Sequence, residues 1–357
     1  MPPAAAAPPP TRVSVIIPMR NEAAYVARCL DSVLAQVAGR DDVEILCVDG
    51  ASTDRTAEIV ADYARRDPRV RLLHNPRRIV PVAMNLALAE ARGEVIIRLD
   101  CHSEYAPDYI AQCLAVLHRT GADNVGGYIT TRPGRDTPVG RAIAAATSSR
   151  FGVGGSAFRV GGGEREVDTV PFGCFRRDVF RRFGMYDERL VRNQDIELNH
   201  RIRKGGGRIV ISPDIRLIYY NRSTYRGLAA QAFANGLWNP YTLYLVGEGL
   251  GMRHFVPLGF VLAVLALALA GFLWRPAWLG LGALLAVYLV GAVGAAVSAA
   301  RASGASVLLI LPAFVVLHFS YGFGSLIGVL TAPLRFRRAP KSPPVPARAH
   351  NTTGTSQ

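Results

Sequence analysis

A carboxylate and an imidazole close one short apolar segment of the chain. Residues 94–102 read Glu-Val-Ile-Ile-Arg-Leu-Asp-Cys-His, which predicts a buried strand that ends at Asp100. Asp100 and His102 are two residues apart, so in an extended chain their side chains point the same way. An oxygen and a nitrogen placed in this way suit one divalent ion or one polar ligand. A strand-end aspartate that merely starts a turn is more common, so the chemistry depends on what other segments add.

A second predicted strand also ends in a carboxylate, Asp49. It belongs to an alternation of apolar strands and helices that begins near residue 12. We expect strands at 13–17, 43–48, 70–73 and 94–99, and helices at 26–37, from a Ser52 or Thr53 cap to 66, and from Pro81 to Gly93. Such units predict an α/β fold with a doubly wound, mostly parallel sheet, whose ligands bind at the carboxyl ends of the strands. Asp49 and Asp100 are therefore expected on one rim of the sheet.

Composition separates a soluble part from a membrane part. Residues 12–254 have the mixed composition of a soluble α/β protein, whereas residues 255–330 are nearly free of charge. The net charge of +14 comes almost wholly from scattered arginine. This scatter argues against nucleic acid as a partner and favours an anionic membrane surface or a phosphorylated substrate. The five cysteines show no CxxC spacing, so we expect free thiols in a reducing compartment.

Four sequence motifs occur in order between residues 12 and 222. They are VSVIIPMRNEA at 13–23, VDGASTD at 48–54, RLDCH at 98–102 and GMYDERLVRNQDIELNHRIRKGG at 184–206. Together they resemble the inverting family 2 glycosyltransferases, whose catalytic domain has the Rossmann-like GT-A fold. The chain looks most similar to the membrane-bound glucosyltransferases of succinoglycan-type exopolysaccharide assembly. This closer likeness is carried by residues 75–105, 194–203, 219–224 and 231–240.

The resemblance implies a nucleotide site at the first two motifs. Pro18, Asn21 and Glu22 would form the loop beneath the nucleotide. Asp49 would accept a hydrogen bond from the uracil or the ribose, and Asp54 would belong to the same site.

The third motif implies a metal site. Asp100 would ligate a Mg²⁺ or Mn²⁺ ion that bridges the donor diphosphate and neutralises the leaving group. The family pattern at this position is D-x-D, but this chain has His102 in the second place. An imidazole ligand shifts the expected preference toward manganese.

The fourth motif implies a catalytic base. Asp195 matches the carboxylate that takes the proton of the acceptor hydroxyl in an inverting transfer. The alternative for Asp195 alone is a helix-start carboxylate stabilised by the helix dipole. Gln194, Arg201 and Trp238 are further candidates for acceptor or loop contacts. Arg201 also lies four residues after Glu197, a spacing typical of a structural ion pair on one helix.

The sequence divides into five parts. We predict a disordered Pro/Ala tail at 1–11, a GT-A domain at 12–222, an amphipathic interfacial segment at 223–254, a transmembrane region at 255–334 and a basic disordered tail at 335–357. Residues 132–166 are rich in glycine and arginine, which predicts a mobile loop over the substrate or a disordered segment. The Q-x-x-R-W motif of processive synthases is absent after Gln231, so processive synthesis is not supported.

Three apolar stretches, 255–274, 277–300 and 306–330, are long enough to cross a bilayer. We expect the first two to do so. Pro312 and several polar or glycine residues interrupt the third, so either two or three crossings are open. Three crossings would place the basic residues Arg335, Arg337, Arg338 and Lys341 outside, against the positive-inside tendency.

The resemblance and these segments together imply a multi-pass enzyme of the cell membrane with its catalytic domain in the cytoplasm. It would transfer a hexose from a nucleoside-diphosphate sugar, UDP-glucose in the first instance, to a polyprenyl-linked saccharide. Membrane lipid and other exopolysaccharide assembly proteins are the expected partners. The alternatives are transfer directly to polyprenyl phosphate and a non-catalytic nucleotide-binding scaffold in the membrane.

Overall fold

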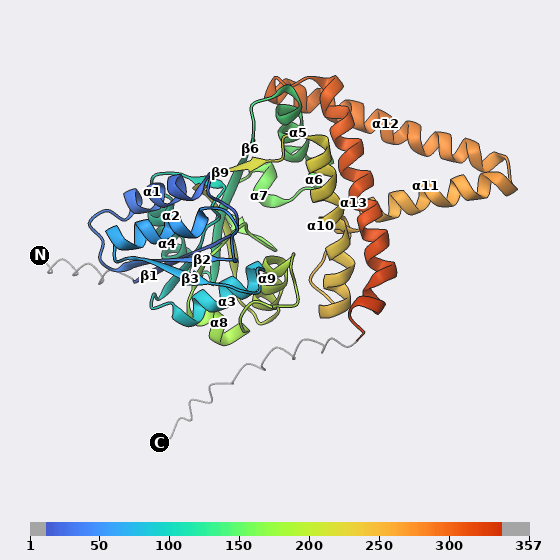
Figure 1. Cartoon of the computed structure of the whole chain (residues 1–357). Helices are drawn as coiled ribbons and strands as arrows, with labels where there is room; N and C mark the ends of the chain where they lie inside the picture. Colours follow the sequence, from blue (N-terminus) through green and yellow to red (C-terminus); the bar gives the residue numbers. More distant parts are fainter. Residues whose placement is uncertain (1–11, 338–357) are drawn as a thin grey trace, which may run out of the picture.

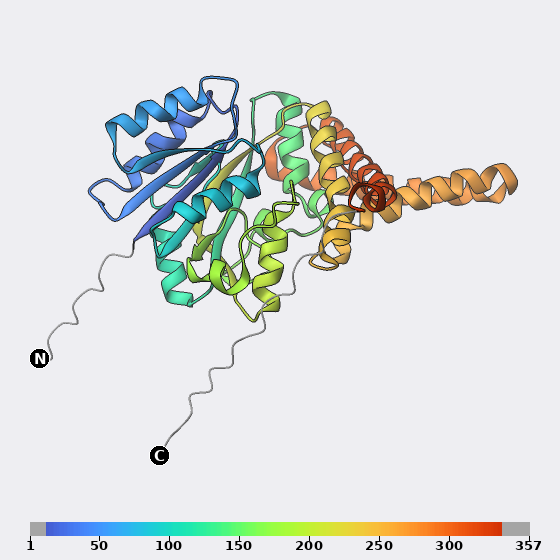
Figure 2. The ribbon, with the colours of Figure 1, turned by 60° about the horizontal axis from the view of Figure 1, so that its bottom comes forward.

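The computed structural model describes residues 12–337, and Figure 1 shows their arrangement. The predicted tail at 1–11 lies outside the described residues, as does the predicted C-terminal tail beyond residue 337. The described part consists of an α/β domain and a helical part beside it (Figures 1 and 2).

A nine-stranded sheet forms the centre of the α/β domain, in the order β3-β2-β1-β4-β8-β6-β9-β5, with β7 paired to β9. β1 to β4 are mutually parallel, whereas β8 runs antiparallel to both β4 and β6. The mostly parallel α/β sheet predicted from the sequence is therefore confirmed. The strands are β1 Val13–Met19, β2 Val43–Asp49, β3 Val70–His74, β4 Val95–Arg98, β5 Ser103–Tyr105, β6 Asn124–Pro133, β7 Arg165–Glu166, β8 Cys174–Arg176 and β9 Ile209–Asn221.

Helices cover both faces of this sheet. One apolar core joins the sheet to α1, α2 and α4, and a second core joins its other face to α3, α8 and α9. Val26, Leu30 and Val33 of α1 are fully buried because their spacing of three and four residues forms one apolar stripe. The helices of this domain are α1 Val26–Gln36, α2 Thr56–Arg66, α3 Val80–Glu90, α4 Tyr109–Thr120, α8 Asp178–Phe183 and α9 Gln194–Lys204.

The segment predicted as a mobile or disordered loop contains regular structure. Residues 132–166 include α5 Pro138–Ser148, α6 Arg150–Val153 and α7 Ala157–Val160, so the prediction of an unstructured segment was wrong. The hydroxyl of Thr137 caps α5 by accepting a hydrogen bond from the amide of Gly140 at 3.0 Å. Ala142 and Ile143 of α5 are buried in a cluster with Phe314 of α13. This long-range burial orders a segment whose own composition indicates a loop.

The helical part contains α10 Tyr225–Val246, a 3₁₀ turn at Met252–His254, and α11 Val256–Leu273, α12 Pro276–Ser303 and α13 Val307–Arg335. The last three are long and apolar enough to span a membrane. The third apolar stretch, whose continuity was in doubt, is one unbroken helix with Pro312 and Pro333 inside it. In both views α11 and α12 form a hairpin that projects away from the α/β domain (Figures 1 and 2).

α13 packs along α10 in the same direction instead of joining that hairpin. The hydroxyl of Tyr225 donates to the carbonyl of Leu309 at 2.7 Å, and the hydroxyls of Tyr241 and Thr331 lie 2.7 Å apart at the other end of the pair. Between them, a Cβ on Gly324 would lie 2.1 Å from the carbonyl oxygen of Phe233. The glycines that seemed to interrupt α13 therefore allow the two backbones to meet.

Candidate active site

The loops that follow β1 and β2 are joined through Asp49 and Asn21. The Asp49 carboxylate, buried at the end of β2, accepts hydrogen bonds from the amide (3.1 Å) and hydroxyl of Ser52. The Ser52 hydroxyl in turn accepts the amide of Asn21 at 2.9 Å, and the Asn21 side-chain oxygen accepts the amide of Thr53 at 2.8 Å. Asn21 has a φ of +56°, a conformation that asparagine tolerates better than most residues. Pro18 lies within β1, beside Val48 of β2.

Asp54 fastens the same two loops from outside. Its carboxylate accepts the amide of Ala23 at 3.1 Å and the amide of Thr56 at 3.0 Å, and these bonds, led by the one from the Thr56 hydroxyl, lower the pKa of Asp54. The predicted cap of α2 by Ser52 or Thr53 was wrong, since neither side chain bonds the first turn and Asp54 bonds Thr56 instead. The nucleotide role of Asp54 stays a prediction, beside this role in the fold.

Glu22, Asp100 and His102 converge at the ends of β1 and β4. His102 Nδ1 lies 3.0 Å from Asp100 Oδ1 and 3.3 Å from Glu22 Oε1. Burial alone would lower the pKa of His102, but hydrogen bonds to the two carboxylates raise it to about 11. Burial opposes the charge of Asp100, but His102 and then Arg98 hold its pKa below the usual value. The amide of Asp100 also donates to the Tyr105 hydroxyl at 2.6 Å, which fixes the strand end.

Within residues 12–337, no group of three or more His, Cys, Asp or Glu side chains is arranged to hold a metal ion. Asp100 stays a candidate ligand, whereas His102, whose Nδ1 bonds both Asp100 and Glu22 and whose pKa is raised, would have to lose its proton before it could bind an ion. One or two protein carboxylates with substrate phosphates and water are a usual ligand set for Mg²⁺. The donor set at this strand end therefore fits an ion that is held jointly with a diphosphate.

Asp195 forms an ion pair with Arg98 of β4. Arg98 is only 6% exposed, and although burial opposes its charge, Asp195 and then Tyr186 and Asp100 raise its pKa. Its guanidinium also lies over the ring of Phe172, 5.8 Å from the centroid. The ion pair with Arg98 places Asp195, the predicted base, beside the strand that ends at Asp100. The sequence signal for Arg98 was a charged residue inside an otherwise apolar run, and its role was missed.

Asn193 connects the start of α9 to the helical part. It has a φ of +62°, and its side-chain amide donates to Asn239 (2.9 Å) and Thr242 (3.2 Å) of α10. The side-chain amide of Asn239 in turn donates a hydrogen bond to the hydroxyl of Tyr321 on α13. Asp195, two residues after Asn193, is thus positioned from both the sheet and the helical part. Sequence reasoning missed this connection because the residues are far apart in the chain.

The other acceptor candidates are more buried. Gln194 is 7% exposed, and its side-chain oxygen has no hydrogen-bond partner within the described residues. Arg201 binds Glu197 and the carbonyl oxygens of Phe183 and Met185, as expected of the structural alternative. Trp238 is 7% exposed in a cluster with Leu190, Tyr241, Leu245 and Ala332. Their proposed contacts with an acceptor stay predictions.

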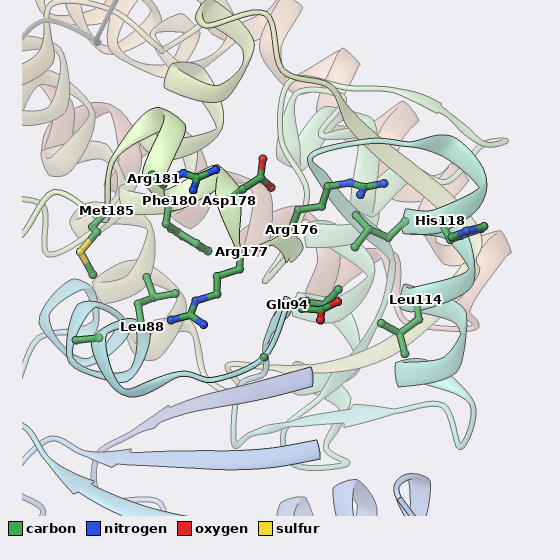
Figure 3. Close-up of a pocket in the computed structure, with 14 residues that line it drawn as sticks. Leu88, Glu94, Leu114, His118, Arg176, Arg177, Asp178, Phe180, Arg181 and Met185 are labelled. Atoms are coloured by element: carbon green, nitrogen blue, oxygen red, sulfur yellow. The ribbon is translucent and has the colours of Figure 1, made fainter. Parts of the chain in front are cut away.

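Two hollows lie at different edges of the sheet. One of about 830 Å³ is lined by residues such as Glu94, Arg177 and Met185 (Figure 3). Because Glu94 precedes β4, this hollow lies at the opposite end of the strand from Asp100. A second hollow of about 630 Å³ includes His102 and Tyr220 and adjoins the carboxylate rim. Parallel sheets bind ligands at the carboxyl ends of their strands, so the rim, not the larger hollow, is the candidate active site.

Known proteins resemble this chain in sequence and in fold. Residues 14–184 match the Glycosyl transferase family 2 profile. The succinoglycan biosynthesis protein ExoA of Rhizobium meliloti is 31% identical over 76% of this chain and 85% of its own length. A dolichyl N-acetyl-alpha-D-glucosaminyl phosphate 3-beta-D-2,3-diacetamido-2,3-dideoxy-beta-D-glucuronosyltransferase of Methanococcus voltae is 24% identical over 73% and 82% of the two chains.

Among solved structures, the mannosyltransferase PcManGT of Pyrobaculum calidifontis, in complex with GDP-Man and Mn²⁺, is similar in fold. It has a TM-score of 0.59 and 21% identity, over 90% of this chain and 87% of that one. This likeness supports the GT-A-like fold, and the identity to the Rhizobium protein over most of both chains shows the family. The chain is therefore a glycosyltransferase that belongs to family 2, with a GT-A-like domain and three helices that could span a membrane.

Proposed function

We propose that the chain transfers a hexose, with inversion, from a nucleoside-diphosphate sugar to a polyprenyl-linked saccharide at the cytoplasmic face of the cell membrane. UDP-glucose is the first donor to test. The Rhizobium relative takes part in succinoglycan biosynthesis, and the name of the Methanococcus relative specifies a sugar linked to dolichyl phosphate. These relatives support a role in building a lipid-linked glycan.

The observation that carries the proposal is a continuous set of contacts along the rim. Asp49 bonds Ser52, and the Ser52 hydroxyl bonds the amide of Asn21. Glu22, the residue after Asn21, contacts His102, and His102 contacts Asp100. Arg98, two residues before Asp100 on β4, then pairs with Asp195. Residues proposed to bind a nucleotide, a diphosphate and an acceptor hydroxyl therefore follow one another along a single edge.

The chemistry assigns different tasks to the two ends of this edge. Asp49 holds the nucleoside, and Asp195 takes the proton from the acceptor hydroxyl as its oxygen attacks the sugar carbon opposite the diphosphate. Arg98 orients the Asp195 carboxylate through their ion pair. A divalent ion held by Asp100 would supply charge to the departing diphosphate. The mannosyltransferase of similar fold contains Mn²⁺, which supports including manganese in the assay.

A screen of radiolabelled sugar nucleotides tests the proposed function. The full-length chain in membranes is incubated with each donor and with lipid extract, and label is measured in the lipid fraction. We expect one donor, UDP-glucose first, to label a lipid-linked saccharide, and Asp100→Ala or EDTA to abolish the signal because the diphosphate loses its counter-ion. Labelling of free polyprenyl phosphate instead would favour the alternative acceptor. No transfer from any donor would favour the scaffold.

The membrane attachment can be proposed from the packing of α10. Arg192 and Asn193, which precede α9 of the α/β domain, bond Asn235 and Asn239 in the middle of α10. α10 therefore lies against the α/β domain, and α13 packs along α10. We infer that α11 and α12 cross the bilayer as a hairpin, while α13 rests beside α10 with its outer apolar face toward lipid. Two crossings return the basic end of α13 to the cytoplasm, as the positive-inside tendency favours.

Cysteine labelling distinguishes two crossings from three. The five native cysteines are buried, which gives a low background for a membrane-impermeant maleimide. We expect Arg275→Cys, in the turn between α11 and α12, to react in intact cells, because this turn would lie outside. Arg337→Cys should react only after the cells are permeabilised. Reaction of Arg337→Cys in intact cells would show that α13 also crosses, and the unsubstituted chain is the control.

A further inference from the structure

Two of the buried or half-buried arginines among the described residues have no ion-pair partner there. Nine arginines of residues 12–337 are buried or half-buried, and seven of them form an ion pair with a carboxylate. The remaining two, Arg159 and Arg192, have no aspartate or glutamate within ion-pair distance in that part of the chain. Removing a charged arginine from water without a counter-ion costs free energy, so we expect these two arginines to bind a negatively charged partner. The seven are Arg40, Arg69, Arg71, Arg98, Arg189, Arg201 and Arg253.

Arg159 lies on α7 between two aromatic rings. Its guanidinium carbon is 5.7 Å from the ring centroid of Phe158 and 5.5 Å from that of Tyr219 on β9. Its Nη1 donates to the hydroxyl of Thr131 at 3.2 Å, a neutral partner. Burial lowers the pKa of Arg159, and only Tyr219 acts in the other direction. The side chain is held in place by its ring contacts while its charge is left uncompensated.

Arg192, the second arginine without an ion pair, lies three residues before Asp195. Its Nη1 donates to the side-chain oxygen of Asn235 on α10 at 2.9 Å. Burial lowers the pKa of Arg192, the nearby cation Arg222 lowers it further, and only Tyr219 acts in the other direction. Arg222 is itself exposed and forms no ion pair within the described residues. Arg159 thus lies over the ring of Tyr219, Arg222 follows that tyrosine by three residues, and Tyr219 and Arg222 both act on the charge of Arg192; we call these three arginines the arginine cluster.

The arginine cluster lies between the rim and the helical part. On one side, the ring of Tyr219 meets the ring of His102 edge-on, with centroids 5.8 Å apart. On the other side, Arg192 contacts α10, which packs against α13. An anion in this place would be close to the site of transfer and could carry an apolar chain toward the membrane.

We propose that the arginine cluster binds the phosphate or diphosphate that links the acceptor saccharide to its lipid. This inference rests on the proposed function, because it names the part of the acceptor that this surface recognises. Guanidinium groups suit phosphate oxygens, to which they donate paired, charge-assisted hydrogen bonds. The donor diphosphate is the other source of the same chemistry. In the proposed site Asp100 and an ion would serve that diphosphate, and the cluster adjoins this site through Tyr219, whose ring meets that of His102.

Equilibrium binding to the full-length chain in detergent tests the assignment without turnover. The probes are geranylgeranyl diphosphate, geranylgeraniol, which has the same chain without phosphate, and UDP. The unsubstituted chain should bind the diphosphate lipid roughly a hundredfold more tightly than the alcohol, as two charge-assisted contacts allow. In Arg159→Gln/Arg192→Gln that preference should nearly disappear, while UDP affinity stays within about twofold, since no donor contact is removed.

The matched control is Arg150→Gln, an exposed arginine of α6 in the same segment, which should keep the lipid preference. Because neither Arg159 nor Arg192 pairs with a carboxylate in the described residues, glutamine at these positions breaks no ion pair of the fold. Thermal unfolding checks that the variants are folded. If the double variant loses UDP affinity instead, the cluster binds the donor, and if neither affinity changes it is structural. Either result overturns the proposal. A failed donor screen with intact lipid preference would refute the transfer reaction alone.

Discussion

The two ends of the carboxylate rim are held in different ways. At the nucleotide end, Asn21 and Ser52 belong to consecutive loops, and their contacts join residues 31 positions apart. At the acceptor end, Arg98 pairs with Asp195 across 97 positions, and Asn193 reaches α10 across 46. The nucleotide end is therefore built within the first strands of the α/β domain. The acceptor end depends on how the helical part docks.

Under the proposed function, this difference would separate substrate binding from chemistry along the rim. A carboxylate bound by neighbouring loop groups, such as Asp49, is suited to hold a ligand in a fixed place. Asp195, the proposed base, is paired to a buried arginine and lies two residues from Asn193, which bonds α10. We therefore expect substitutions at the two ends to have separable effects on donor affinity and on turnover.

The largest effect is expected at Asp195. Asp195→Asn keeps the size and hydrogen bonding of the side chain but removes its basicity. Single-turnover transfer should fall by roughly a hundredfold to ten-thousandfold, the usual contribution of a positioned general base. UDP affinity, measured by calorimetry, should remain because Asp49 and the strand end at Asp100 are unchanged. Asp178→Asn, an acid on α8 paired with Arg182, is the matched control.

Asp49→Asn gives the opposite pattern if the comparison is correct. Loss of a hydrogen bond to a charged group should weaken UDP roughly tenfold to hundredfold, with a smaller change in transfer at saturating donor. Equal loss of UDP binding and transfer in Asp195→Asn would mean that Asp195 only supports the fold through Arg98. Asp187 and Glu188 in the same motif would then be the next candidates for the base.

The same contrast explains what could be predicted from the sequence. The strands that end at Asp49 and Asp100 are marked by apolar runs, and their parallel pairing places both carboxylates on one rim, so local pattern was sufficient. The order in residues 132–166 was not predictable, because α5 is stabilised by burial against α13. The pairing of α13 with α10 was also missed, since glycines that allow close helix contact look like interruptions in a hydropathy pattern.

His102, where the two ends meet, has the smallest expected effect. Its pKa of about 11 in the folded chain exceeds the ordinary value for histidine because it is bonded to Asp100 and Glu22. A raised pKa means that folding is stabilised fully below about pH 6.5 and that this contribution is lost as the pH rises toward 11. The low pKa of Asp100 adds stability that is present above its ordinary value of about 3.9 and lost in acid.

The test compares thermal unfolding of the full chain and His102→Gln in detergent with EDTA at pH 6, 8 and 10. Glutamine keeps a hydrogen-bond donor but no charge, so the variant should be less stable by about 1 kcal/mol at pH 6, a value reduced for the partial exposure of His102. The difference should shrink as the pH rises to 10, because the imidazole of the unfolded chain loses its proton above about pH 6.5 whereas the folded imidazole keeps its proton up to about pH 11. His118→Gln, at the exposed end of α4, should show no such trend. A difference that is independent of pH would mean that His102 joins the two ends by packing against Tyr219, and not by its charge.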